Sequence, residues 1–144
     1  MPQSPTDAYA FLSALRPYME AFVERNPGRR LVLLRKALVP QAEICGPSRV
    51  FAGYAEISEK IDGFHKNWPD CHLVLAGGVI MFKNAGHFPK AIVGPDGQIR
   101  AAGHSVVELA PDGRIQRVLA FWGQHPQLPA SWPEHLTVQF TAPG

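Results

Sequence analysis

The sequence predicts an α+β fold in which a curved antiparallel sheet packs on three helices from the N-terminal half of the chain. Two observations support this fold class. Apolar residues recur at helical spacing in much of the first half, whereas from Cys71 onward they form short β-branched runs between turn residues. Helices followed by an antiparallel meander are expected to cover one face of the sheet, and the sheet must curl around them.

The helices are identified by their apolar periodicity and by the residues at their ends. Thr6 or Asp7 can cap the first helix, and we expect a kink or break at Pro17, because proline lacks an amide hydrogen and crowds the preceding turn. The second helix ends before Pro40. Helices are expected at 7–24, 29–38 and 54–66, with a short strand at 42–46.

Four longer strands are expected in the second half of the chain, at 73–82, 87–93, 99–109 and 114–122. The segments between them are rich in Asn, Gly, Pro and Asp, which tolerate positive φ or preset a turn, so three consecutive hairpins form a meander. Beyond Trp122 the chain is rich in proline and is expected to run extended along the surface, where 136–140 can add an edge strand.

Length and composition fit one domain over 1–144, with its core at 8–128 and an extended tail at 129–144. Apolar residues make up 46% and charged residues 18%, which excludes a disordered or collagen-like chain. The net charge is only +2 and the basic residues are scattered, so nucleic-acid binding is disfavoured.

The two cysteines, Cys45 and Cys71, show no metal-binding spacing and suit a reducing compartment. No segment approaches the roughly 18 apolar residues of a membrane helix, and the N-terminus lacks the pattern of a leader peptide. We therefore expect a cytoplasmic protein that does not bind membranes. The chain contains no nucleotide-binding glycine motif, so no organic cofactor is expected.

The order of elements carries a resemblance. The third helix opens with Gly-Tyr-Ala-Glu-Ile at 53–57, and Ala-Pro-Asp-Gly-Arg-Ile at 110–115 is followed by Phe-Trp at 121–122. Over 8–128 this arrangement resembles the nuclear transport factor 2-like superfamily, and within it the SnoaL-like polyketide cyclases and the ketosteroid isomerases. The resemblance implies a conical, cystatin-like half-barrel with a ligand pocket between sheet and helices, usually in a homodimer formed through the convex face.

The resemblance also suggests roles for individual residues. Tyr18 stands where the isomerases carry their oxyanion tyrosine, and Ser105 where they carry a second, acidic donor. Gly46 occupies the position of the isomerase base, and a glycine cannot accept a proton. Cys45 or Glu43 could replace that base only from a neighbouring position, and strand alternation turns one of the two away. Steroid enolisation by the isomerase route is therefore not expected.

Three histidines lie on three of the predicted strands. If the strands match the isomerases without slips, His72 and His87 point inward beside Val74 and Ala91, whereas His104 points outward. A β-bulge would reverse the faces of one strand. Because a neutral imidazole can act as acid or base near pH 7, His72 and His87 are the predicted proton-transfer groups. The alternative, ordinary partly buried histidines, stays open.

Two other charged residues are candidates for the same site. Asp70 either orients an imidazole at the pocket mouth or is a solvated residue at a strand entry. Lys90 is a candidate inward cation, but strand alternation favours the outer face for it. The histidines show neither a His-x-His pair nor a nearby inward carboxylate, so no metal is expected.

These observations predict an enzyme of the SnoaL-like type, with isomerase-, cyclase- or hydrolase-type acid–base chemistry on a small, apolar, oxygen-bearing molecule. The alternatives are a non-catalytic small-molecule-binding domain and a dimerising module of the same fold, within a superfamily whose functions differ widely. The predicted catalytic residues are Tyr18, His72, His87 and Ser105. The predicted pocket-lining residues are Phe22, Cys45, Val74, Val118, Ala120 and Trp122.

Overall fold

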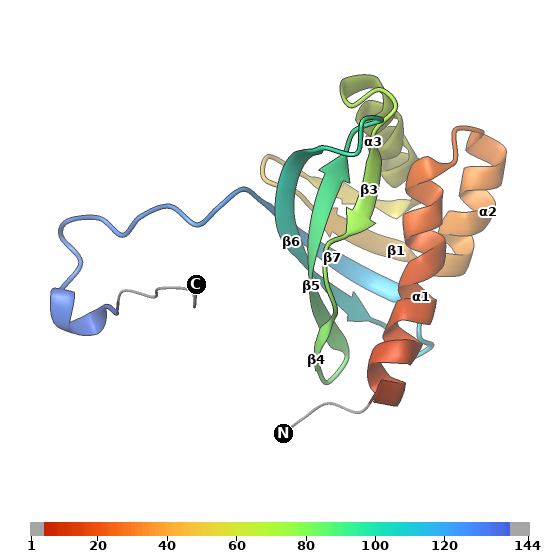
Figure 1. Cartoon of the computed structure of the whole chain (residues 1–144). Coiled ribbons are helices and arrows are strands. Elements are labelled where there is room, and N and C mark those ends of the chain that lie inside the picture. Colours follow the sequence, from red (N-terminus) through yellow and green to blue (C-terminus); the bar gives the residue numbers. More distant parts are fainter. Residues whose placement is uncertain (1–4, 139–144) are drawn as a thin grey trace.

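A computed structural model describes residues 5–138 of the chain, with side chains described from residue 8 onward. Three helices pack against one curved sheet (Figure 1). The helices are α1 (Pro5–Val23), α2 (Pro27–Ala37) and α3 (Gly53–Asn67). The strands are β1 (Leu38–Cys45), β2 (Val50–Ala52), β3 (His72–Leu75), β4 (Ile80–Phe82), β5 (Ala85–Val93), β6 (Ile99–Leu109) and β7 (Ile115–Trp122), and a short 3-10 helix follows at Glu134–Leu136.

The sheet has the strand order β2-β1-β7-β6-β5-β3, and β4 pairs with the far end of β5. The meander of β5, β6 and β7 that the sequence predicts is confirmed, and its strands run antiparallel. The sheet as a whole is mixed, because β1 runs parallel to β7. The α+β class is confirmed, and the expectation of an all-antiparallel sheet is corrected by this one pair.

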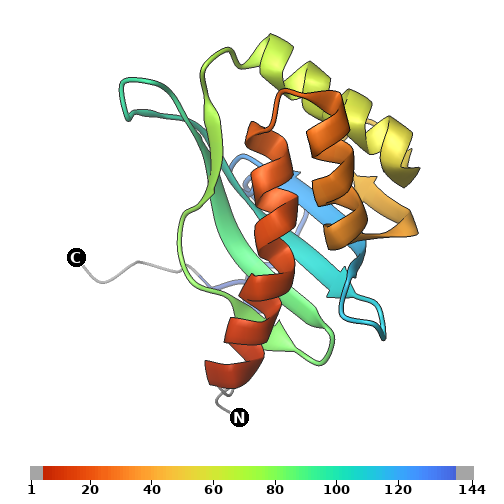
Figure 2. The same cartoon turned by 90° about the vertical axis from the view of Figure 1, so that its right-hand side faces the viewer.

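The helices cover the concave side of the sheet. Figure 2 shows α1 and α2 side by side in front of the strands, with α3 crossing at one end. Pro17 lies inside α1, which continues without a break to Val23. α1 begins at Pro5, so Thr6 and Asp7 lie within the helix and not at its cap.

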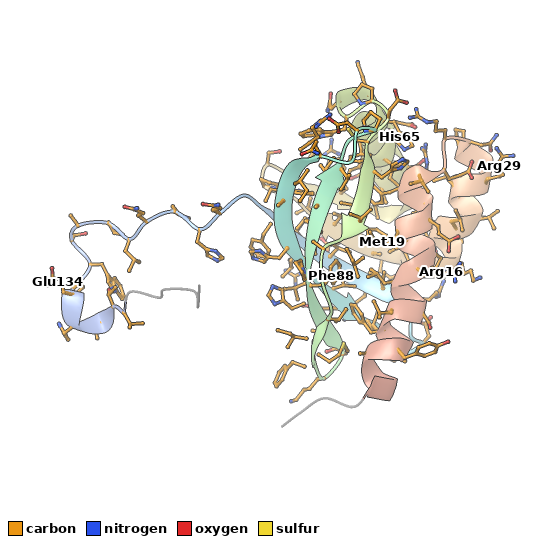
Figure 3. All side chains as sticks on the ribbon, in the orientation of Figure 1. Arg16, Met19, Arg29, His65, Phe88 and Glu134 are labelled. Atoms are coloured by element: carbon orange, nitrogen blue, oxygen red, sulfur yellow. The ribbon has the colours of Figure 1, made fainter. Side chains whose placement is uncertain are left out.

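The core lies between helices and sheet, where apolar side chains from every helix meet those of β1, β5, β6 and β7. Figure 3 shows Met19 of α1 and Phe88 of β5 in this layer, while Arg16 and Arg29 point away from it. The largest fully buried apolar side chains are Phe11, Leu15, Leu34, Leu38, Ile44, Ile57, Ile61, Val107 and Ile115.

One charged side chain is part of this packing. Arg30 of α2 is completely buried and donates to the carboxylate of Asp62 at 2.7 Å and to the hydroxyl of Ser58 at 3.0 Å, both on α3. Its Nε also donates to the Glu24 carbonyl at 2.9 Å. Because all these acceptors belong to the helical layer, Arg30 fixes α3 relative to α2 and so fixes one wall of the space above the sheet.

Several boundaries differ from those the sequence predicts. The strand expected at 73–82 is two strands, β3 and β4, separated by a segment that contains Gly77 and Gly78, which offer no side chains for packing. Strand β2 was not predicted. The tail leads away from the body instead of along its surface (Figure 1). Of the edge strand expected at 136–140, residues 139 and 140 lie outside the described residues, and Leu136 ends the 3-10 helix.

Candidate active site

A cavity of about 480 Å³ lies between the helices and the concave face of the sheet. This volume falls in the range of about 300–1,000 Å³ that is typical of small-molecule sites. Most of its lining is apolar or aromatic. The lining residues include Tyr18, Met19, Phe22, Ile44, Phe51, Phe64, Trp68, Leu73, Phe88, Ile92, Ala101, Val118, Ala120 and Trp122, together with the polar or charged residues Glu59, Lys60, Asn67, Lys90 and Ser105.

Three of the polar lining residues are almost completely buried. Tyr18 is 5% exposed, Ser105 is 3% exposed and Lys90 is 5% exposed. The hydroxyl groups of Tyr18 and Ser105 and the ammonium of Lys90 form no hydrogen bond with another described residue. In the described part of the chain, every side-chain nitrogen or oxygen that is fully buried has a hydrogen-bond partner. Their polar tips must therefore face accessible space, and the accessible space beside all three is the cavity.

Lys90 reaches the cavity through a gap left by a glycine. In the sheet, Lys90 of β5 pairs with Gly103 of β6, and Gly103 pairs with Trp122 of β7. A Cβ at Gly103 would lie 2.0 Å from the Phe121 carbonyl oxygen, so a side chain cannot be accommodated there. With no side chain between them, the ammonium of Lys90 lies over the Trp122 ring, 4.0 Å from its centre.

Ser105 lies in the next row of the same face. It pairs with Phe88 of β5 and with Ala120 of β7. Phe88 is two residues from Lys90 on one strand, which makes Ser105 and Lys90 diagonal neighbours, with a separation of about 7–8 Å between such positions. The hydroxyl of Ser105 and the ammonium of Lys90 therefore face one part of the cavity.

Burial changes the acid–base properties of these groups. It raises the pKa of Tyr18, so the phenol stays protonated and acts as a hydrogen-bond donor. Burial, and next the positive charge of Lys60, lowers the pKa of Lys90 to about 8. A lysine with this pKa exchanges its proton close to neutral pH, which is the property that general acid–base catalysis requires.

The cavity lining carries further charges. Lys60 of α3 lies over the ring of Phe51, with its ammonium 4.9 Å from the ring centre, and burial lowers its pKa. The guanidinium of Arg49 lies over the same ring at 4.1 Å and approaches the Glu56 carboxylate at 3.6 Å. Among the described residues, no ion pair joins Lys60 or Lys90 to an acid. Glu59 also lines the cavity, but it is exposed.

Six of the predicted catalytic and pocket-lining residues lie in this lining. Both predicted donors are among them, Tyr18 from helix α1 and Ser105 from strand β6. Their predicted roles in catalysis stay predictions. The predicted pocket-lining residues found in the cavity are Phe22, Val118, Ala120 and Trp122.

The inward orientation predicted for His87 is wrong, because the hairpin of β5 and β6 contains a bulge. Val93 pairs with Ile99, but the preceding residue Ile92 pairs with Ala101, so Arg100 is an extra residue in β6. Without this residue Ser105 would lie opposite His87. With it, Ser105 lies opposite Phe88, so Phe88 and Lys90 face inward and His87 faces outward. The expectation that Lys90 lies on the outer face is wrong for the same reason.

On strands β3 and β1 the cavity-facing residues also lie one position away from those that the sequence predicts. On β3, Leu73 lines the cavity, whereas His72 and Val74 lie on the other face, opposite Val93 and Ala91. The inward orientation predicted for His72, Val74 and Ala91 is therefore wrong.

On β1 the buried Ile44 lines the cavity, and Cys45, which was predicted to line it, alternates to the other face beside Leu119. Gly46 follows the last residue of β1 and its amide donates to the Arg49 carbonyl, so the place of the isomerase base offers no side chain.

The histidines occupy two other places. His72 lines a separate hollow of about 540 Å³ together with Asp70 and His65, and Asp70 lies there 4.0 Å from Arg25 in an exposed contact. On the outer face of the sheet, the ring of His104 stacks with those of Phe121 and His125 and meets His87 edge-on. The catalytic roles predicted for His72 and His87 thus have no support from the cavity.

The described residues show neither a metal-binding cluster nor a membrane-spanning helix. No group of three or more His, Cys, Asp or Glu side chains in residues 8–138 is arranged to hold a metal ion. None of the described helices is both long and apolar enough to span a membrane.

The curved sheet, the three covering helices and the cavity between them define a class of protein, that of the nuclear transport factor 2-like, or cystatin-like, fold. Solved structures share this architecture over most of the chain. A protein of cystatin-like fold from Methylobium petroleophilum PM1 superposes with a TM-score of 0.64, covering 94% of this chain and 95% of its own, at 14% sequence identity.

Within this class the similarity extends to SnoaL-like proteins. A protein assigned as a SnoaL-like isomerase from Agrobacterium tumefaciens C58 is 28% identical, with a TM-score of 0.74, and the match covers 81% of this chain and 99% of the other. A protein assigned as a SnoaL-like polyketide cyclase from Jannaschia sp. CCS1 is 13% identical, with a TM-score of 0.66 and coverage of 85% and 90%. The resemblance that the sequence predicts is therefore confirmed.

Comparisons at the level of sequence alone gave no such relatives. No protein-family profile matches the chain, and no curated protein is significantly similar to it.

Proposed function

We propose that this chain is an acid–base enzyme of the SnoaL-like type. In this proposal it acts on a small, largely apolar molecule that carries a carbonyl or hydroxyl oxygen. Tyr18 and Ser105 donate hydrogen bonds to that oxygen, and Lys90 moves the proton. The apolar face of Trp122 holds the body of the molecule beside them.

The observation that supports this proposal most strongly is the presence of three largely buried polar side chains in one mostly apolar cavity, where none of their polar tips has a hydrogen-bond partner among the described residues. A few polar groups in an otherwise apolar cavity are typical of small-molecule sites, where they fix the orientation of the ligand. Donors directed at an oxygen on which negative charge develops are among the largest contributors to catalysis. Tyr18 and Ser105 supply two such donors, and Lys90 adds a positive charge nearby.

In this proposal Lys90 has the proton-transfer role that the sequence analysis predicts for His72 and His87. With a pKa of about 8, about one molecule in ten carries the neutral amine at pH 7. The neutral amine can accept a proton from a carbon next to the carbonyl, and the ammonium that forms can return it at another position. A desolvated lysine is a known solution to the need for a base near neutral pH.

The test is exchange of the protons next to the carbonyl of cyclohexanone in deuterated buffer, followed by NMR. We expect the protein to accelerate exchange, and Tyr18→Phe or Ser105→Ala to lower the rate by about 10²-fold or more, the usual effect of losing one such donor. Tyr9→Phe is the matched control, because Tyr9 is on the same helix and 74% exposed. The rate should rise with pH through about 8, because the base must be neutral.

A specific observation favours the second candidate, a non-catalytic binding domain. Gly46 leaves the position of the isomerase base without a side chain. A protein that only binds its ligand needs no base at this position. Cyclohexanone that binds in a manner sensitive to Tyr18→Phe, without any exchange at pH 7 to 9, would contradict the enzyme and support this alternative.

We further propose a homodimer formed through the outer face of the sheet. The side chains of Val74, Ile80, Phe82 and Phe121 are 36%, 69%, 73% and 49% exposed, and all belong to strands of this one sheet. An exposed apolar surface of this kind commonly marks a protein interface. Both cysteines are free, which suits the cytoplasmic location that we propose for it.

A further inference from the structure

The cavity contains more positive charge than the described residues around it compensate. Lys60 and Lys90 both line it, both are at least partly buried, and each ammonium contacts an aromatic ring instead of a carboxylate. The two ammonium groups repel each other, since the charge of Lys60 helps to lower the pKa of Lys90. Removing a charge from water without an opposite charge is unfavourable, so proteins seldom retain such a pair without a use for it.

The charge of Lys60 has no ion-pair partner among the described residues. Lys60 and Arg49 both lie over the ring of Phe51, but the ion pair in this group joins Arg49 to Glu56, at 3.6 Å. Glu59 precedes Lys60 on helix α3, but its side chain is exposed to solvent and forms no ion pair with Lys60 among the described residues. The ammonium of Lys60 thus remains available to an anion that enters the cavity.

We propose that the ligand is an organic acid, and that Lys60 binds its carboxylate. This inference rests on the proposed function, because the same ligand presents its carbonyl or hydroxyl oxygen to Tyr18 and Ser105. The ligand class is therefore a small apolar oxo- or hydroxy-carboxylic acid, with its carboxylate near Phe51 and its second oxygen near Trp122.

The geometry favours one monocarboxylate over a larger or more highly charged anion. The cavity of about 480 Å³ is largely apolar, so most of the ligand surface must be apolar as well. A single carboxylate bound at Lys60 offsets part of the repulsion between Lys60 and Lys90. It would also raise the pKa of Lys90 on binding, since a nearby negative charge favours the ammonium form.

The experiment compares two ligands that differ only in charge, 4-oxocyclohexanecarboxylate and 4-oxocyclohexanecarboxamide, by isothermal titration calorimetry at pH 7. We expect the acid to bind at least tenfold more tightly than the amide. Lys60→Met should reduce the affinity for the acid to that for the amide and change the affinity for the amide by less than threefold. Lys66→Met, a change to an exposed lysine of the same helix, should preserve the preference.

The outcomes separate this inference from the proposed function. Equal affinity for acid and amide in the unmodified protein, or a preference that survives Lys60→Met, would overturn the assignment of a carboxylate to Lys60. If the preference depends on Lys60 while Tyr18→Phe with Ser105→Ala leaves both affinities unchanged, the inference stands and the proposed oxygen site fails. Absence of binding by both compounds at millimolar concentration would overturn both.

Discussion

Replacing Lys90 with methionine should make the protein more stable at pH 7. Folding lowers the pKa of this lysine from 10.5 to about 8, which corresponds to a cost of roughly 3 kcal/mol for holding the ammonium in the cavity. Methionine has a similar length and no charge. Its gain is reduced by the lost contact with the Trp122 ring, worth about 0.5–2 kcal/mol. We expect a net gain of about 1–2 kcal/mol, or about 3–6 °C in Tm.

The pH dependence of this gain gives the sharper test. Below pH 8 the folded and unfolded states of the unmodified protein both hold the Lys90 proton, so the cost is complete. Between pH 8 and 10.5 only the unfolded state holds it, and stability then rises with pH. The advantage of Lys90→Met should therefore narrow by at least about 1 kcal/mol from pH 7 to pH 10.

The assay is urea unfolding followed by circular dichroism at pH 7, 8, 9 and 10, with exposed Lys66→Met as the matched control. The control should differ from the unmodified protein by less than about 0.5 kcal/mol at each pH. A Lys90→Met protein that is less stable than the unmodified one at pH 7, or a difference in free energy of unfolding that stays constant from pH 7 to pH 10, would show that Lys90 is not destabilising in its charged form.

Three further predictions concern the frame around the site. Arg30→Met should lower the free energy of unfolding by about 2–4 kcal/mol, because the buried guanidinium loses its hydrogen bonds to Glu24, Ser58 and Asp62; urea unfolding measures this, and exposed Arg29→Met should change little by comparison. Gly103→Ala should lower Tm and weaken ligand binding, because its Cβ would meet the Phe121 carbonyl oxygen; an unchanged Tm in thermal unfolding would contradict the close contact. Phe82→Glu should convert a dimer into a monomer in light scattering after gel filtration, and a protein that is monomeric before the change would exclude the proposed dimer.

The sequence predicts the fold well because the signals for it are local. Helical periodicity in the first half and turn residues between the last strands identify the three helices and the meander. The faces of β6 and β7 were also predicted correctly, since Ser105 and Trp122 lie in the cavity lining as expected. Strand β4 and the short β2 were missed, because runs of three residues carry little periodic signal.

The site was predicted less well, because a single extra residue decides which face of strand β5 points into the cavity. The bulge at Arg100 moves β5 by one position against β6 and exchanges His87 for Lys90 as the cavity-facing polar group. Both faces of β5 are rich in apolar residues, so alternation along that strand alone does not identify the inner one. Lys60 lies on helix α3, where an amphipathic pattern marks a boundary residue without indicating a cavity beside it.

A crystal structure with 4-oxocyclohexanecarboxylate would show whether the cavity binds an oxygen-bearing ligand through Tyr18 and Ser105. We expect the ring carbonyl oxygen within about 3.2 Å of both hydroxyl groups, with the carboxylate beside Lys60 and the ring against Trp122. Density for the compound outside this cavity, or a carbonyl oxygen directed at its apolar wall away from both hydroxyl groups, would contradict the account.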